Sequence, residues 1–350
     1  MTIYCLGECD NLIKNKQDSL LYNIVLDLKN NHEFEIPHDL IYKPQSGDEY
    51  NSILGSIKYS YDYLSKNTSY TSHATEISKQ NDTIYFENIF LYNLLPFYNF
   101  IVVEVELNGV TGNFIIDTGF EVSYLDYTKL PKYNLEFVEK INQLYKFDSK
   151  VKHYRSNSLR LSSLNITDKL FACGRLNLNY FYKNILEIDG IIGWDIISEL
   201  NIILNYRDKF IIINPTQENI SLISQYSLIR LPMPYLYLKD QNGIDVLTSF
   251  DTGSDMSFFT NTFLRKNNYK LEQLQEKYIF SYNGKFSIYS AKTANCLLFF
   301  GNNPVEDILV TNDKVNGFPK NDFVLGANAF QNKIIYLNNR NKIISILNSE

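Results

Sequence analysis

Residues 114–125 read FIIDTGFEVSYL, and residues 248–259 read TSFDTGSDMSFF. Each stretch contains the triplet Asp-Thr-Gly, with a serine four residues after the glycine. The two aspartates, Asp117 and Asp251, are 134 positions apart, and so are the two serines. A single Asp-Thr-Gly occurs by chance in about 6% of chains of this length. Two in register, with matching flanks, indicate an internal duplication.

The duplication extends in both directions from the two triplets. An Asn-Gly dipeptide stands nine residues before each aspartate. Downstream, residues 191–213 (IIGWDIISELNIILNYRDKFIII) align without a gap onto residues 324–346 (VLGANAFQNKIIYLNNRNKIISI). Within this alignment Gly193 matches Gly326, and we expect each glycine to let the backbone pass close to the loop after its triplet.

The pattern within each half predicts β-strands and few helices. Residues 101–107 (IVVEVEL) alternate, and the Asn-Gly that follows predicts a hairpin leading back into Asp117. Asn283-Gly284 predicts a further hairpin in the second half. Asp195 and Asn328 each follow an apolar pair and a glycine, and they predict the N-cap of one short helix each.

The doubled triplet predicts acid–base chemistry. An apolar strand carries each aspartate to a buried position, which raises its pKa. If the halves pack around a pseudo-twofold axis, Asp117 and Asp251 meet and share one proton, because adjacent carboxylates do not both ionise easily. One carboxylate can then activate a water as general base while the other protonates a carbonyl oxygen. Such peptide hydrolysis needs no metal, no cofactor and no histidine.

The neighbours of the aspartates have predicted supporting roles. Gly119 and Gly253 allow the chain to turn sharply after each aspartate. Thr118 and Thr252 are small hydroxyl residues that can hydrogen-bond across the pseudo-twofold axis.

In these residues the chain resembles the aspartic peptidases of the pepsin–retropepsin group. The stretch LLPFYNFIVVEVELNGVTGNFIIDTG (94–119) is especially similar to bacterial single-chain members. The resemblance covers residues 86–350. It implies a mainly β, bilobal, pepsin-like acid-protease fold with pseudo-twofold symmetry. The lobes, 86–218 and 219–350, would each contribute one catalytic aspartate to a cleft that binds an extended peptide or protein substrate.

The resemblance also implies β-hairpin flaps over the substrate. They would fall near residues 146–154 and 280–289. Tyr145 or Tyr154 in the first hairpin, and Tyr282 in the second, are the candidates for the group's flap tyrosine.

The residue after each triplet differs between the halves. Ser254 fits the group's preference for a small residue, whereas Phe120 does not. A serine hydroxyl can hydrogen-bond the adjacent carboxylate and favour its charged form, so we expect Asp251 to carry the charge. This asymmetry predicts activity toward neutral pH. Phe120 also leaves an alternative function open, a catalytically weak or inactive peptide-binding module that keeps the fold.

One chain that holds both aspartates predicts a monomer rather than a homodimer. The leading function is therefore an aspartic endopeptidase that makes limited cuts in a protein or peptide precursor.

Residues 1–85 have no counterpart in the sequence repeat, and their structure is not predicted. They contain 7 Lys, no Arg and 12 Asp or Glu, and so hold five of the six net negative charges of the chain. An add-on packed against the first lobe, a recognition module and a propeptide-like inhibitor are the three interpretations. The net charge of −6 provides no overall basic field for binding nucleic acid.

The sequence gives little information on the cellular compartment of the protein. The four cysteines lack the spacing of a zinc site or a disulfide framework. The first residues lack the cationic start and apolar segment of a signal peptide, and no stretch is long enough to span a membrane. We expect a cytoplasmic protein from the sequence as it stands, or a secreted or periplasmic one if a signal segment was trimmed.

Overall fold

The computed structural model describes residues 82–88, 100–138, 152–176, 187–215, 222–230, 233–281, 284–294, 296–306, 308–311 and 321–348. This part of the chain is mainly β, as predicted. Its helices are short: η2 (Tyr127–Lys129), α5 (Leu130–Tyr133), α7 (Trp194–Ile197), α8 (Asn261–Lys266) and η3 (Ala327–Ala329). None of the helices in these ranges is long and apolar enough to cross a membrane.

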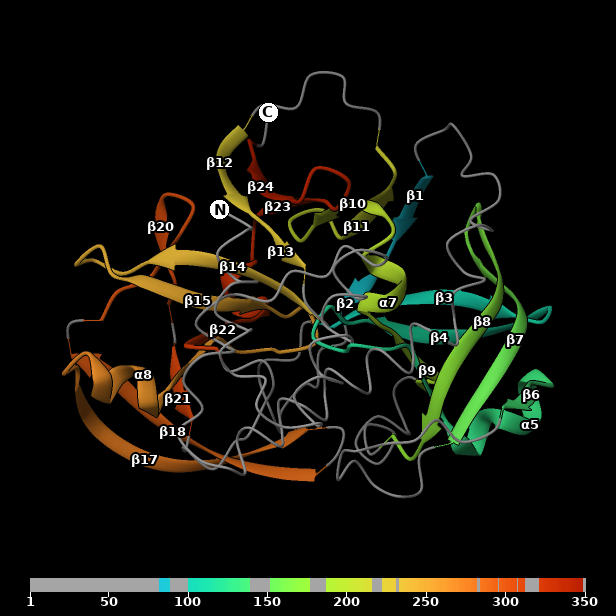
Figure 1. Cartoon of the computed structure of the whole chain (residues 1–350), viewed down its shortest axis with the longest axis horizontal. Coiled ribbons are helices and arrows are strands. Elements are labelled where there is room, and N and C mark those ends of the chain that lie inside the picture. Colours follow the sequence, from blue (N-terminus) through green and yellow to red (C-terminus); the bar gives the residue numbers. More distant parts are fainter. Residues whose placement is uncertain are drawn as a thin grey trace, which may run out of the picture.

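Two eight-stranded sheets have the same strand order. The first is β2 (Glu87–Asn88), β3 (Ile101–Leu107), β4 (Val110–Ile116), β9 (Gly190–Ile192), β5 (Tyr124–Asp126), β8 (Leu164–Gly174), β7 (Lys152–Leu161) and β6 (Glu136–Val138). The second is β13 (Ile229–Arg230), β14 (Pro234–Lys239), β15 (Asp245–Phe250), β22 (Phe323–Leu325), β16 (Phe258–Thr260), β21 (Leu309–Thr311), β18 (Gly284–Ala294) and β17 (Lys270–Ser281). Each strand of one sheet therefore has a counterpart in the other. Figure 1 shows β3, β4, β7 and β8 on one side of the molecule and β14, β15, β17 and β18 on the other.

A third sheet joins the two halves. Its order is β1 (Asp82–Tyr85), β11 (Phe210–Ile213), β10 (Asn201–Asn205), β23 (Ile334–Asn338), β24 (Ile343–Leu347) and β12 (Leu222–Ser227). At its centre β10 and β23 pair antiparallel, with Ile203 opposite Tyr336. These two residues are equivalent in the sequence repeat, so a pseudo-twofold axis passes between them. A small hairpin, β19 (Phe299–Phe300) and β20 (Asn303–Pro304), completes the strands.

Strand β1 shows that the first half starts earlier in the chain than residue 86. It lies within the predicted N-terminal extension, yet it pairs with β11 as β12 pairs with β24. The backbone N–H of Phe86 donates to Lys209 O (3.0 Å), as Leu228 donates to Lys342 O (2.8 Å). The repeat therefore reaches back to Asp82 rather than to residue 86. The rest of the predicted extension, residues 1–81, lies outside the described residues.

The predicted hairpins form at the predicted places. Asn108 and Gly109 have φ of 49° and 83°, and Leu107 pairs with Val110 across the turn. Both central residues thus adopt the left-handed region that a two-residue turn between twisted strands requires. The hairpin predicted by Asn283-Gly284 is β17–β18, whose last described pair joins Ser281 to Gly284.

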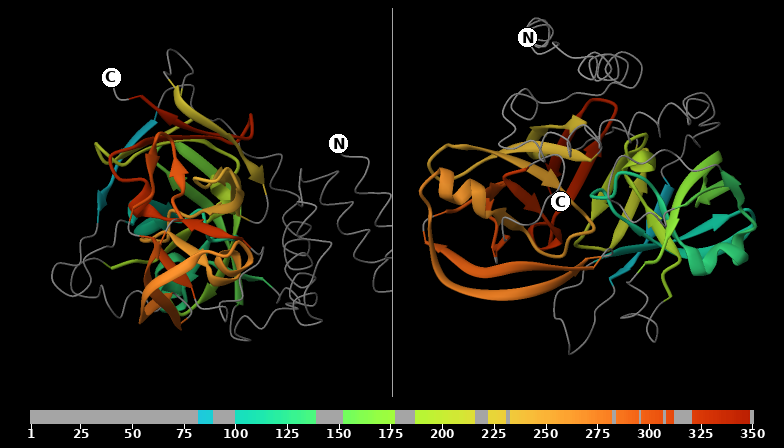
Figure 2. Two further views of the ribbon diagram at one scale, coloured as in Figure 1. Left: turned by 90° about the vertical axis from the view of Figure 1, so that its left-hand side faces the viewer. Right: turned by 60° about the horizontal axis from the view of Figure 1, so that its bottom comes forward.

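One hydrophobic cluster extends through both halves. Phe330 stacks on Phe250 (ring centroids 4.6 Å apart), and Tyr206 of the first half packs on Phe330 at 5.4 Å. Phe250 and Phe330 are fully buried. Figure 2 shows the strands of the two halves side by side. Because the apolar surface of each half is covered partly by the other, the halves are expected to unfold together.

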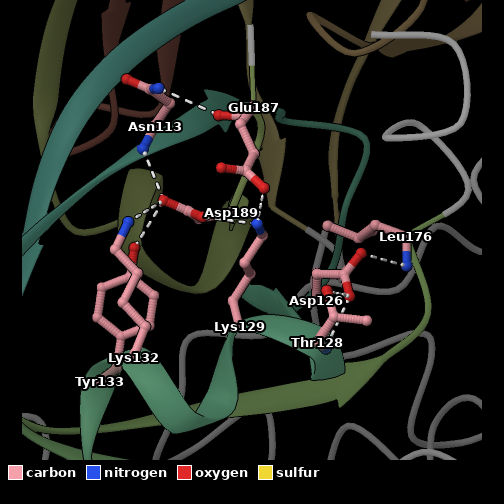
Figure 3. Close-up of polar contacts among 9 residues, drawn as sticks. All are labelled: Asn113, Asp126, Thr128, Lys129, Lys132, Tyr133, Leu176, Glu187 and Asp189. Carbon is pink, nitrogen blue, oxygen red and sulfur yellow. Dashed lines mark hydrogen bonds and ion pairs between the residues drawn. The ribbon is translucent and has the colours of Figure 1, made fainter. Parts of the chain in front are cut away.

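The buried carboxylate of Asp189 forms hydrogen bonds that connect elements of the first sheet. Asp189, just before β9, accepts hydrogen bonds from Tyr133 Oη (2.7 Å) and Lys132 Nζ (2.9 Å). It also accepts one from the backbone N–H of Asn113 in β4, at 3.2 Å. Lys129 pairs with exposed Glu187 at the edge of this cluster (Figure 3). The cluster ties β4, β9 and the helical turn of α5 together.

We predict that Asp189→Asn lowers the free energy of unfolding by about 2 kcal/mol, because a buried carboxylate with several donors loses its charge. Glu187→Gln is the matched control, and it should cost less than about 1 kcal/mol because Glu187 is exposed. Urea denaturation of both variants measures the difference. Equal effects would contradict the role given to Asp189.

Candidate active site

Two equivalent strands end at the same place in the molecule. Strand β4 leads into Asp117 and β15 leads into Asp251. The backbone N–H of Asp117 donates to Ile192 O, and that of Asp251 donates to Leu325 O, both at 3.0 Å. Each aspartate is thus held by the parallel strand beside it, β9 or β22.

The two threonines form a reciprocal set of hydrogen bonds. The backbone N–H of Thr118 donates to Thr252 Oγ1, and the N–H of Thr252 donates to Thr118 Oγ1, both at 3.0 Å. Thr118 Oγ1 in turn donates to Phe250 O (2.7 Å), and Thr252 Oγ1 donates to Ile116 O (2.9 Å). Both threonines are fully buried. The hydrogen bonds predicted across the axis are therefore present.

The glycines bring the two carboxyl groups together. Each aspartate accepts a hydrogen bond from the glycine two residues on, at 2.8 Å in Asp117 and 2.9 Å in Asp251. A Cβ on Gly119 would lie 2.4 Å from Asp251 Cγ, and one on Gly253 would lie 2.1 Å from Asp117 Cγ. Only glycine leaves room for this packing. The carboxyl groups also hydrogen-bond each other.

The pKa shifts of the two carboxyl groups favour Asp117 as the carrier of the shared proton. Burial and the nearby charge of Asp251 raise the pKa of Asp117 well above its usual range. Burial also raises the pKa of Asp251, but only to about 6, because the N–H of Gly253 and the hydrogen bond from Asp117 stabilise its charged form. Asp251 therefore carries the negative charge. This order agrees with the sequence prediction.

The reason predicted for that order is wrong. Ser254 Oγ donates to Met256 O at 2.8 Å, so its hydroxyl proton is directed to the backbone and not to Asp251. The N–H of Gly253 and the hydrogen bond from Asp117 lower the pKa of Asp251 most, and the backbone N–H of Ser254 adds a smaller effect; the N–H of Phe120 acts on Asp117 in the same way. Phe120 thus retains the backbone contribution, and its ring packs edge-on against Tyr124 at 5.7 Å.

The loop after each triplet is tied to the residue predicted as a helix cap. Ser123 donates to Asp195 Oδ1 from both its N–H and its hydroxyl, at 2.8 Å each. Ser257 makes the same two bonds to Asn328 Oδ1, at 2.7 Å each. The N-caps of α7 and η3 are instead Gly193 and Gly326, without side-chain cap bonds. The capping prediction is therefore wrong, because both side chains bind the serine of the loop after their triplet.

The residues that hold the two loops differ in charge: Asp195 in the first half and Asn328 in the second. Asp195 pairs with Lys169 of β8, and both side chains are almost completely buried. In the second half, Asn328 Nδ2 donates to Glu306 O at 2.7 Å. The first half thus holds its loop through a buried ion pair, and the second through neutral amide contacts.

The glycines of the downstream repeat have the predicted role. A Cβ on Gly193 would lie 2.8 Å from Phe120 O, and one on Gly326 would lie 2.8 Å from Ser254 O. The next residue in each case, Trp194 or Ala327, donates its N–H to that same carbonyl at 2.7 Å.

One of the three candidates for the flap tyrosine, Tyr154, lies within the described residues. Tyr154 lies in β7 opposite Phe137 of β6, its ring 5.5 Å from that of Phe137, and it packs on the hydrophobic core. It is a packing residue at the base of the β6–β7 hairpin. Tyr145, Tyr282 and most of the predicted first flap, 146–154, lie outside the described residues.

Three polar side chains near the aspartates were not predicted. The hydroxyl of Tyr206 is buried without a hydrogen-bond partner in the described structure, and it lies in the electrostatic field of both aspartates. Tyr235 of β14 is fully buried in the fields of Glu121 and Asp251. Of these three, only Glu121 carries a sequence signal, its place two residues after the first glycine.

No protein-family model matches the chain, and no curated protein matches it. Among the described residues, no group of three or more His, Cys, Asp or Glu is arranged to hold a metal ion.

We predict that Thr118→Val destabilises the protein by about 2–4 kcal/mol, because it leaves the buried Thr252 N–H and Phe250 carbonyl unsatisfied. Thr118→Ser is the matched control. It keeps the hydroxyl and loses only one methyl group, which should cost about 1 kcal/mol. Urea denaturation measures both. If the two variants are equally destabilised, the hydroxyl hydrogen bonds of Thr118 do not contribute the stability assigned to them here.

Proposed function

We propose that this protein is an aspartic endopeptidase with a bilobal, pepsin-like fold. The observation that carries the proposal is the pair of hydrogen-bonded carboxyl groups, Asp117 and Asp251, at the junction of two equivalent halves. The same strand order in both eight-stranded sheets and the joining six-stranded sheet support the fold. The substrate would be an extended peptide or protein segment, and one chain would suffice because it supplies both aspartates.

The protonation states assign a role to each aspartate. The ionised Asp251 acts as general base and removes a proton from a water molecule, which attacks the carbonyl carbon of the peptide bond. The protonated Asp117 donates its proton to the carbonyl oxygen. Asp251 then passes the proton that it took from water to the amide nitrogen of the tetrahedral intermediate. The C–N bond breaks as Asp117 regains its proton from a hydroxyl of the intermediate, which leaves a carboxylic acid and an amine. No covalent bond to the protein forms.

The alternative is a peptide-binding module that keeps the fold without efficient catalysis. Phe120 was the reason to consider it. Its side chain packs into the first half, against Tyr124 and the neighbouring apolar cluster, and its backbone N–H still acts on Asp117. These contacts favour the peptidase.

We predict that Asp117→Asn and Asp251→Asn each reduce peptide cleavage by about a thousandfold or more, because each removes the acid or the base. Asp245→Asn is the matched control, since Asp245 lies on the strand that ends in Asp251 but is exposed and paired with Lys239. Cleavage of a peptide library, read by mass spectrometry, measures activity, and circular dichroism verifies the fold. Activity that survives both dyad changes would refute the mechanism, and an inactive wild type would favour the binding module.

We predict an activity profile whose acidic limb has its midpoint near pH 6. Below that pH Asp251 is protonated and cannot act as a base, because burial raises its pKa to about 6. Activity falls again at higher pH, where Asp117 loses the proton that it must donate. The pH dependence of kcat/KM on one cleaved peptide measures both limbs. An optimum below about pH 4 would contradict the assigned protonation states.

A further inference from the structure

Lys169 and Asp195 form an ion pair inside the first half. Their side chains are 4% and 6% exposed, so both charges lie away from water. Lys169 belongs to β8 and Asp195 to α7. Asp195 Oδ2 binds Lys169 Nζ, and Asp195 Oδ1 accepts both hydrogen bonds of Ser123. Burying two charges is costly, and this combination of a close pair with further hydrogen bonds is what offsets the cost.

Ser123 links this ion pair to the loop that begins at Asp117. At the start of the loop, the backbone N–H of Asp117 donates to Ile192 O at 3.0 Å. At its end, Ser123 O accepts the N–H of Ala172 in β8, also at 3.0 Å, and Ser123 binds Asp195 through its N–H and its hydroxyl. The loop is therefore held at both ends. Because packed interiors transmit strain, a displacement of Ser123 also displaces the carboxyl group of Asp117.

The second half holds its equivalent loop through a neutral amide. Ser257 makes the same two hydrogen bonds to Asn328 Oδ1. The equivalent pairings of β5 with β8 and of β16 with β21 place Glu306 where the first half has Lys169. The Glu306 side chain is exposed, and its backbone carbonyl accepts a hydrogen bond from Asn328 Nδ2 at 2.7 Å. An amide is therefore sufficient to hold such a loop, and the first half has two charges in its place.

We propose that Lys169 is a positioning residue, which acts through Asp195 and Ser123 on the loop that carries the catalytic acid. The inference rests on the proposed function, because this position affects a reaction only if the carboxyl pair is catalytic. Without Lys169, the Asp195 carboxylate remains buried without its cation, which is strongly unfavourable, and it is relieved by moving toward water. That movement breaks the charge-assisted hydrogen bonds to Ser123. An amide at position 195 does not carry this cost.

Lys169→Met in the full chain tests the inference, because methionine fills a similar space without the charge. We expect kcat on a cleaved peptide to fall about tenfold to a hundredfold while KM changes less than about twofold, since a misplacement of about 1 Å has an effect of this size. Lys239→Met is the matched control: it removes the same charge from an exposed ion pair with Asp245 and should leave kcat unchanged. Each variant is measured well below its own thermal midpoint, so that the protein is folded.

The double variant Lys169→Met/Asp195→Asn tests whether Lys169 acts through Asp195. Its amide can accept both hydrogen bonds of Ser123, as Asn328 does for its own serine, so we expect kcat to return to within about threefold of the wild type, a non-additive result. A double variant no more active than Lys169→Met would overturn the inference. So would a Lys169→Met protein that loses stability but keeps the wild-type kcat. If Lys169→Met does not fold, Asp195→Asn replaces it in this comparison, because it breaks the same pair from the other side.

Hydrogen exchange measures the position of the loop without depending on cleavage. Mass spectrometry after deuterium exchange compares residues 114–125 with the equivalent residues 248–259 of the same molecule. In Lys169→Met we expect exchange to be about tenfold faster in the first segment alone, because the hydrogen bonds of Ser123 open locally. Unchanged exchange in residues 114–125 would overturn the inference. Failure of the peptidase proposal is separate, because the wild type then cleaves no peptide while exchange in the first segment still rises in Lys169→Met.

Discussion

The reciprocal hydrogen bonds between Thr118 and Thr252 are the contact on which the site depends. Each threonine places its hydroxyl between a backbone N–H and a backbone carbonyl of the opposite half. Fully buried polar groups are costly when they are unpaired, so neither half can keep these threonines inside without the other. The same contact sets the approach of the two aspartates, which directly precede the threonines in sequence. The geometry of the carboxyl pair is therefore a consequence of how the halves are joined.

The loops after the two Asp-Thr-Gly triplets share one hydrogen-bond pattern but differ in charge. A serine four residues after each Asp-Thr-Gly binds the same carboxyl or amide oxygen through both its N–H and its hydroxyl. Each serine also accepts the N–H of a glycine, from Gly193 at 3.1 Å or Gly326 at 2.9 Å. The first half completes this network with the buried pair of Asp195 and Lys169, and the second with the amide of Asn328. The backbone path has stayed symmetric while the charges have diverged, so symmetry in the fold does not require symmetry in proton affinity.

Local signals predicted local structure well. The Asn-Gly hairpin, the low helix content and the close packing at the two glycines of the downstream repeat depend on short-range sterics, which a few residues determine. The predictions failed where a side chain had a choice of partners. Asp195 and Asn328 have the composition of helix caps, yet each binds a serine about 70 residues away in sequence. Asp189 and Asp322 are also repeat equivalents, and each accepts an N–H from a central strand, of Asn113 or Leu247. Their equivalent places in the repeat are a sequence signal of this shared role.

The amino-acid sequence by itself determined that the chain is duplicated, that each half is β-rich, and that Asp117 and Asp251 occupy equivalent positions. These facts follow from spacing and composition, which are visible along the chain. Only the tertiary structure decided which donors surround each aspartate, and that strand β1, from Asp82 to Tyr85, belongs to the repeat. These properties depend on burial and on donors brought from distant strands. The pKa of a carboxyl group reflects everything that surrounds it in space, and sequence order alone does not specify those surroundings.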